Sequence, residues 1–155
     1  GSAERYAESD TIAPGDRYVV TETPLGRLGM AVCYDLRFPE QFRALAEQGM
    51  EIMTLPAAFT TTTGQAHWEI LLRARAIENQ CYFIAAAQCG RHADGRETHG
   101  DSLIIDPWGT ILGRQPWGPG VVLAEFSRKR LESIRQQFPV LRHRVSLLRI
   151  GSDQS

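Results

Sequence analysis

Short apolar runs bounded by turn residues alternate with longer amphipathic stretches along this chain. Short runs of this kind are typical of strands, and apolar side chains three or four positions apart indicate helices. The pattern predicts strands at 18–22, 27–33, 51–55, 81–88, 102–106, 110–114 and 121–125. It predicts helices at 39–48, at 65–79 and between Ser127 and Pro139. Residues 60–64 and 90–100, which are polar or rich in Thr and Gly, are expected to form loops.

This order of elements predicts an α/β fold with a mixed sheet. Helices must cover at least one face of that sheet, and the second face needs a cover from further helices or from another sheet. The 155 residues contain no repeat and no internal linker, which favours one domain over 1–155 with an irregular tail at 139–155.

Composition narrows the classes of function. Apolar residues make up 43% and charged residues 23% of the chain, and the formal charge is −1. This balance indicates a globular protein without a general affinity for nucleic acid. The basic stretch after Ser127 is interpreted as a solvated helix face with a dimer contact. With no long apolar run and no leader pattern, we expect neither a membrane span nor a signal peptide.

Three cysteines without a CxxC pair argue against a disulfide scaffold or a zinc ribbon, and they favour a reducing, cytoplasmic setting. No set of His, Cys, Asp and Glu has the spacing of metal ligands, so we expect neither a metal nor a cofactor.

Cys33 is the candidate nucleophile because it ends an apolar run and precedes a charged turn. Such a position brings the sulfur to the carboxyl edge of a sheet, where ligands of α/β proteins bind, and places backbone N–H groups nearby. The alternative is a buried, inert cysteine. We interpret Cys81 and Cys89 as structural. The base that activates a thiol could be one of four histidines, His67 among them, or a carboxylate.

Five motifs occur in the order found in one family. They are 29–40 (GMAVCYDLRFPE), 56–59 (PAAF), 63–69 (TGQAHWE), 73–79 (RARAIEN) and 106–109 (DPWG). With them, the chain resembles the nitrilase superfamily of carbon–nitrogen hydrolases over about residues 8–149. The segment AAAQCGRH at 85–92 is most similar to the branch whose members act as deaminated-glutathione amidases.

The resemblance implies an α-β-β-α sandwich, usually a homodimer, that hydrolyses a small-molecule amide through a cysteine thioester. Residue by residue, it makes Cys33 the nucleophile and the N–H of Tyr34 an oxyanion donor. It makes Glu8 the second glutamate of the site, which orients a lysine and the leaving group. Arg37 is expected to bind a substrate carboxylate, with Asp35, Ala58 and Phe59 also in substrate binding. The alternative for Arg37 is a structural pair with Asp35 or Glu40.

The family pattern also requires a general-base glutamate and an oxyanion lysine ahead of Glu8, and this sequence has no counterpart of either. Lys129 does not match that lysine. We therefore expect a C-terminal portion of an amidase for a linear, deaminated-glutathione-like ω-amide. The alternatives are an omega-amidase, another linear-amide hydrolase, or a catalytically incomplete fragment with a dimerisation role.

Overall fold

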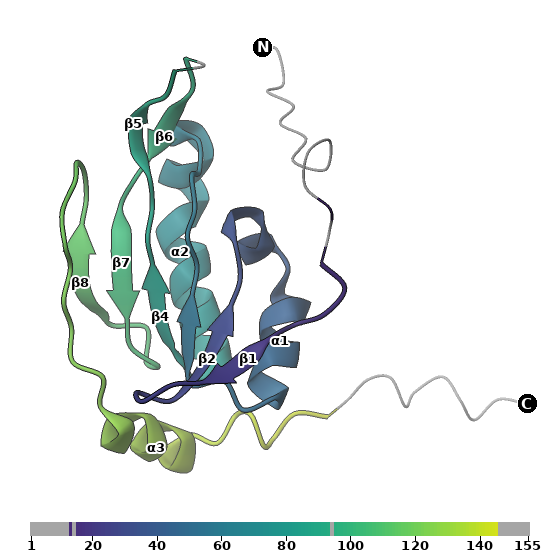
Figure 1. The fold of residues 1–155 in the computed structure, drawn as a ribbon. Helices are drawn as coiled ribbons and strands as arrows, with labels where there is room; N and C mark the ends of the chain where they lie inside the picture. The colour runs from purple at the N-terminus through teal and green to yellow at the C-terminus, as the bar shows by residue number, and fades with distance from the viewer. Residues whose placement is uncertain (1–12, 14, 94, 146–155) are drawn as a thin grey trace, which may run out of the picture.

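A six-stranded mixed sheet forms the centre of the computed structural model, which describes residues 13, 15–93 and 95–145 (Figure 1). Its strand order is β1-β2-β3-β4-β7-β8. The strands are β1 (Val20–Glu22), β2 (Arg27–Met30), β3 (Ile52–Thr54), β4 (Tyr82–Ala85), β7 (Ser102–Ile105) and β8 (Ile111–Gln115). β2, β3 and β4 run parallel, and the other pairs are antiparallel. The predicted α/β class with a mixed sheet is therefore confirmed.

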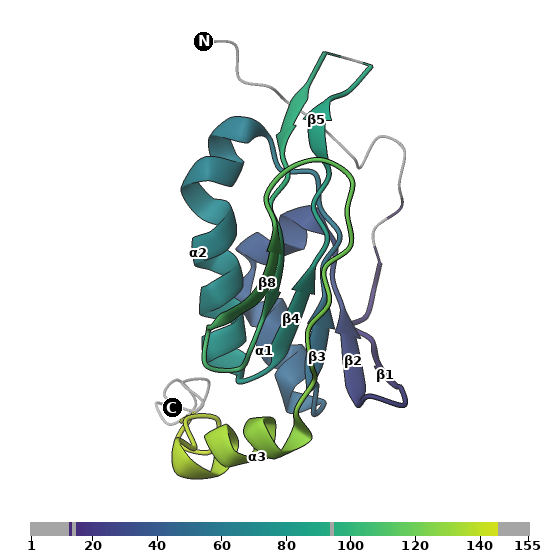
Figure 2. The same cartoon turned by 90° about the vertical axis from the view of Figure 1, so that its left-hand side faces the viewer.

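Two helices cover one face of the sheet. α1 (Pro39–Glu47) connects β2 to β3, and α2 (Thr61–Asn79) connects β3 to β4. Parallel strands joined in one direction by crossovers of the same hand place their helices on the same side. Figure 2 shows both helices on that side, with α3 (Arg128–Gln137) across one end of the sheet.

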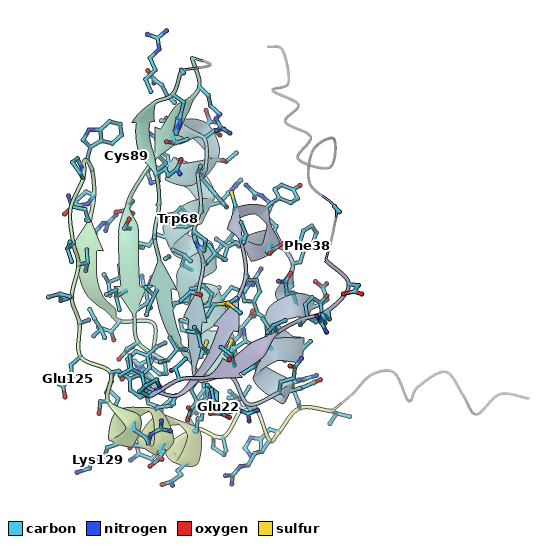
Figure 3. All side chains as sticks on the ribbon, in the orientation of Figure 1. Glu22, Phe38, Trp68, Cys89, Glu125 and Lys129 are labelled. Carbon is cyan, nitrogen blue, oxygen red and sulfur yellow. The ribbon has the colours of Figure 1, made fainter. Side chains whose placement is uncertain are left out.

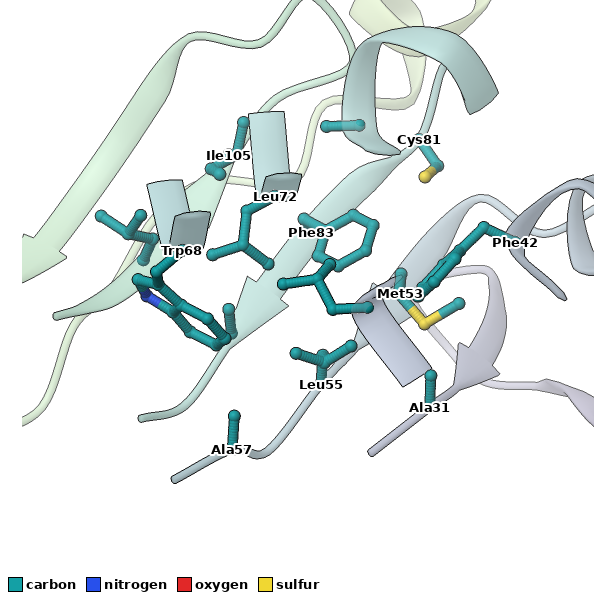
Figure 4. Packing of buried hydrophobic residues seen from close by; sticks show 14 of the residues in the cluster. Ala31, Phe42, Met53, Leu55, Ala57, Trp68, Leu72, Cys81, Phe83 and Ile105 are labelled. Atoms are coloured by element: carbon teal, nitrogen blue, oxygen red, sulfur yellow. The ribbon is translucent and has the colours of Figure 1, made fainter. Parts of the chain in front are cut away.

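The main hydrophobic core lies between these two helices and the sheet. Phe42 from α1, Leu72 from α2 and Phe83 from β4 have no exposed surface, and the ring centroids of Phe42 and Phe83 lie 5.8 Å apart (Figure 4). Burying a side chain of this size contributes roughly 1.5–3 kcal/mol. Packing of the helices on the strands therefore holds the strands in their places in the sheet, and the candidate site lies at one edge of that sheet.

Among the residues that the structure describes, the opposite face of the sheet is covered mainly at one end. There, Leu131 of α3 and the ring of Phe126 pack near Ile52 and Tyr82. Two residues further along each strand, on the same face, four residues lie side by side across four strands: Met30, Thr54, Ile84 and Ile104. Met30 is 47% and Ile84 39% exposed. This partly apolar row agrees with the expectation that the second face needs a cover.

The polar stretch at 90–100 is a β-hairpin and not the loop that its composition predicted. β5 (Cys89–Arg91) and β6 (Glu97–His99) pair antiparallel. Thr98 is fully buried, and its hydroxyl contacts Nε2 of His92 at 2.8 Å. The ladder is reinforced from outside, because the N–H of His99 donates to the carbonyl of Phe59 at 2.9 Å. Tertiary contacts of this kind override a polar composition.

The Thr/Gly loop predicted at 60–64 is also wrong, because α2 already begins at Thr61. The hydroxyls of Thr60 and Thr63 lie 3.0 Å apart across the first turn, and Gly64 is buried where α2 meets β6. A glycine permits that close approach, so packing extends the helix through residues of low helix propensity.

The strand predicted at 121–125 does not form. Among the described strands, β8 pairs with β7 alone, and residues 121–125 run beside it without a ladder. Val121 is 84% and Leu123 86% exposed. Ser127 does cap α3, since its hydroxyl accepts the N–H of Arg130 at 3.2 Å. Residues 139–145 contain neither helix nor strand, as predicted for the tail, and 146–155 lie outside the described residues.

Candidate active site at the carboxyl ends of the parallel strands

Cys33 lies where the chain leaves the sheet after β2 and enters the 3-10 helix η2 (Cys33–Arg37). The backbone of Ala31 still follows β3, with its N–H donating to Thr54 at 3.1 Å, and the N–H of Cys33 donates to Pro56 at 2.8 Å. Cys33 itself has a φ of 44°, a region that residues other than glycine rarely adopt. The expected edge position of Cys33 is confirmed, and its backbone geometry is that of a sharp strand-to-helix turn.

The segments that follow β3 and β4 lie beside Cys33 because parallel strands end at the same edge of a sheet. The N–H of Ala57 donates to Ala86, and the N–H of Gln88 donates to Ala57, both at 2.9 Å. These bonds join the two segments into one wall. An open cleft of about 460 Å³ results, lined by Val32, Cys33, Pro56, Ala57, Ala58, Ala86, Ala87, Gln88 and Ser102. Its small alanine side chains leave room above the half-buried cysteine.

The N–H of Tyr34 is the candidate oxyanion donor beside the sulfur, because the N–H groups of Cys33 and Asp35 donate to the carbonyls of Pro56 and Val32. The first N–H groups of a helix lack acceptors within the helix, and Tyr34 occupies the second position of η2. Asp35 meets part of this need, since its Oδ2 accepts the N–H of Val32 at 2.8 Å. The carboxylate thus stabilises the turn that carries Cys33. Its predicted contact with substrate stays a prediction, as does the oxyanion role of the Tyr34 N–H.

Arg37 lies among three side chains and not in either of the predicted ion pairs. Its guanidinium carbon is 5.5 Å from the ring centroid of Tyr34 and 5.1 Å from that of Phe59. Nη1 lies 3.3 Å from Nδ1 of His67. Within the described ranges, Arg37 forms no salt bridge with Asp35 or Glu40. The alternative that Arg37 forms a structural ion pair with Asp35 or Glu40 is therefore not supported.

Arg75 anchors η2 from α2, and sequence reasoning did not single it out. Its side chain is almost fully buried, and Nε and Nη2 donate to the carbonyl of Leu36 at 3.2 and 3.0 Å. Nη1 lies 3.0 Å from Oε1 of Glu78. The signal was present in the sequence, because Arg75 falls between Leu72 and Ala76 on the buried side of α2. A charged residue at such a position needs a buried acceptor.

The two other cysteines do not line this cleft. Cys81 is fully buried, and burial raises the pKa of its thiol to about 12, which keeps it protonated and inert. Cys89 lies at the base of the β5–β6 hairpin, and its Sγ accepts the N–H of Gly118 at 3.0 Å (Figure 3). Both positions agree with a structural role.

The remaining residues that the sequence analysis named lie in different places. Glu8 lies outside the described residues. Ala58 lines the cleft, whereas Phe59 is buried, with its ring centroid 4.9 Å from that of Trp68 and its face toward Arg37. Lys129 lies on α3, at the end of the sheet opposite η2 (Figure 3).

Among the described residues, no group of three or more acidic, histidine or cysteine side chains could hold a metal ion. No helix there is both long and apolar enough to cross a bilayer.

A sharp strand-to-helix turn that presents a side chain above a cleft is also the place where α/β-hydrolases carry their nucleophile. The carbon-nitrogen hydrolase family matches residues 3–136, and the chain belongs to this family, within the nitrilase superfamily. A deaminated glutathione amidase of Yersinia enterocolitica is 56% identical over 139 residues, which cover 90% of this chain and 49% of that protein. The chain thus spans about half the length of this relative.

Solved structures agree with this assignment. The NitFhit protein of C. elegans superposes with a TM-score of 0.87 at 42% identity, over 92% of this chain and 35% of that one. An E41Q mutant of the amidase from Nesterenkonia sp. AN1 gives a TM-score of 0.69 at 31% identity, over 85% of this chain and 52% of that one. That amidase carries acrylamide added to its active-site cysteine. The nitrilase fold predicted from the motifs is therefore confirmed for the part that this chain covers.

Proposed function

We propose that this chain carries the nucleophile of an amidase that cleaves a small linear ω-amide of the deaminated-glutathione type through a thioester at Cys33. The observation that carries the proposal is the placement of Cys33, half-buried at a strained turn and above the open cleft. The name of the Yersinia relative supports the substrate class, and the adduct on the Nesterenkonia amidase supports a reactive cysteine in a protein with this fold.

The proposed reaction has two halves. The Cys33 thiolate attacks the amide carbon, a C–S bond forms, and the carbonyl oxygen becomes an oxyanion to which the N–H of Tyr34 donates. The C–N bond then breaks, and the leaving amine takes up a proton. Water adds to the thioester, the sulfur leaves as thiolate, and the carboxylic acid is released.

The chain supplies part of this machinery. We propose that the general-base glutamate and the oxyanion lysine come from residues that this sequence does not include, with Glu8 as the second glutamate of the site. The family resemblance supports this division of roles. A cysteine thiol without an activating base is a weak nucleophile at neutral pH.

The partly uncovered face of the sheet gives the rest of the fold a place to pack. The row of Met30, Thr54, Ile84 and Ile104 would be covered by a second sheet, which would complete an α-β-β-α sandwich. Leaving Met30 and Ile84 in water forgoes stabilisation of roughly 25 cal/mol per Å² of apolar surface. A homodimer and a cytoplasmic location remain predictions from the sequence.

Arg37 suits a substrate that ends in a carboxylate. It lies four residues after Cys33 on η2, and a 3-10 helix rises about 2 Å per residue, so the two Cα atoms are about 8 Å apart along the axis. A linear ω-amide with a carboxylate at its other end can extend between two such points. A planar guanidinium is also the side chain best shaped for a carboxylate.

The natural full-length protein with Cys33→Ala tests the proposal, and Cys89→Ala is the matched control because both cysteines are half-buried. We expect amine release from a deaminated-glutathione-type amide to fall by several orders of magnitude in Cys33→Ala alone. Mass spectrometry of the wild-type protein during turnover should show the acyl group on the peptide that contains Cys33. Turnover that persists in Cys33→Ala, or an equal loss in both variants, would rule out the thioester at this residue.

A further inference from the structure

The surroundings of Arg37 come from three separate parts of the chain. Tyr34 lies one turn earlier on η2, Phe59 follows β3, and His67 lies in the second turn of α2. The two rings and the imidazole surround a guanidinium that is itself half-buried. Phe59 is held in turn by Trp68, the neighbour of His67 on α2, whose Nε1 donates to the carbonyl of Asp101 at 2.7 Å.

In the contact between Arg37 and His67, one residue must be the hydrogen-bond donor and the other the acceptor. An arginine side chain has only donors, so in this contact Nη1 of Arg37 donates a hydrogen bond to Nδ1 of His67. A hydrogen bond in this direction uses the lone pair on Nδ1, so it is made by the tautomer whose ring proton is on Nε2. In that state the imidazole is not itself available as a base at Nδ1. Within the described residues, no hydrogen bond joins His67 to Cys33, which argues against a Cys–His pair between them.

The arrangement limits how the guanidinium can turn. The rings of Tyr34 and Phe59 lie within the distance at which a cation interacts favourably with an aromatic face. The contact with Nδ1 then sets the rotation of the guanidinium between these rings. The N–H groups of Arg37 that His67 does not contact remain for a ligand. An arginine side chain that moves freely would lose far more rotamer freedom on binding a ligand than Arg37, which is already held in place.

We propose that His67 is a positioning residue for a carboxylate subsite centred on Arg37. By accepting one N–H of Arg37, it holds the guanidinium in the orientation in which the remaining N–H groups meet the carboxylate of a linear amide substrate. The rings of Phe59 and Tyr34 hold the guanidinium at this place through cation–π contacts. This assignment rests on the proposed amidase function and adds to it the residue that makes the enzyme selective for an acid-bearing amide.

The test uses the natural full-length protein and two amides that differ at one end. One is a linear ω-amide with a terminal carboxylate, and the other has a methyl group in place of that carboxylate. We expect His67→Ala to lower the preference for the acid, as a ratio of kcat/KM values, by about tenfold, mainly through KM. His67→Asn, whose side-chain oxygen can replace Nδ1 as acceptor, should recover most of the preference. His143→Ala, at an exposed histidine after α3, is the control and should keep the wild-type preference.

A double-mutant cycle with Arg37→Met separates positioning from general damage. If His67 acts through Arg37, the double variant should prefer the acid no less than Arg37→Met alone. Equal losses on both amides in His67→Ala, or additive losses in the double variant, would overturn the role of His67 and leave the amidase proposal intact. A wild-type protein that hydrolyses neither amide would overturn the proposed function, and the subsite with it.

Discussion

Replacement of Arg75 by methionine should both destabilise the protein and slow its chemistry. Arg75 is the only described side chain with hydrogen bonds to the carbonyl of Leu36, and it makes two of them from a nearly solvent-free position. Methionine keeps a similar apolar stem against Phe42, whose ring centroid lies 5.6 Å from the guanidinium carbon. The variant therefore removes mainly the donors and not the packing.

The magnitude follows from these contacts. A hydrogen bond from a charged donor contributes about 1.5–3 kcal/mol, and because both bonds share one acceptor we count that contribution once. The pair with Glu78, whose side chain is 33% exposed, adds about 0.5 kcal/mol after screening by solvent. We expect Arg75→Met to lower the free energy of unfolding by about 3 kcal/mol. Arg75→Lys, which keeps the charge but not the fork, should lose about half as much.

Urea unfolding of the full-length protein measures the first effect, and kcat measures the second. Release of the Leu36 carbonyl loosens the end of η2, and a misplacement of the nucleophile by about 1 Å can cost a hundredfold in rate. Arg73→Met is the matched control on the same helix, where the arginine side chain is 48% exposed and donates to Gly109. Equal unfolding free energies and equal kcat values for Arg75→Met and Arg73→Met would refute the proposed clamp.

Two further predictions concern Gly64 and Cys81. A Cβ at Gly64 would collide with the side chain of His99, so Gly64→Ala should lower the free energy of unfolding by about 1–3 kcal/mol, although alanine has the higher helix propensity. A Cβ at Gly15 meets no atom, so Gly15→Ala should have little effect in the same urea assay. Burial raises the pKa of the Cys81 thiol to about 12 in the folded protein, while a cysteine thiol in an unfolded chain has a pKa of about 8.5. The unfolded chain therefore binds fewer protons between these values, and stability should fall by up to about 1.4 kcal/mol per pH unit as the pH rises through this window. Cys81→Ala should remove that slope, and an unchanged slope would contradict the assignment to this thiol.

The sequence by itself determined the elements whose patterns are local. The helix predicted at 39–48 and the structure's α1 differ by one residue, because Pro39 fits a first turn and Gly49 has the positive φ that ends a helix. The buried strands near 27–33, 51–55 and 81–88 occur in the predicted order, although each is shorter than its apolar run. The position of Cys33 was also readable, since an apolar run that ends in a charged turn places its last residue at the carboxyl edge of a sheet, whereas its role as nucleophile rested on the family motifs.

Only the tertiary structure decided the features that depend on distant contacts. The hairpin of β5 and β6, the early start of α2 at Thr61 and the missing strand at 121–125 each depend on a neighbour far away in the sequence. The surroundings of Arg37 have the same origin, because Phe59 and His67 reach it from two other segments. Hydrophobic periodicity records which face of an element is buried, but it does not record which elements meet. Polar contacts between loops therefore appear only once the helices and strands have packed.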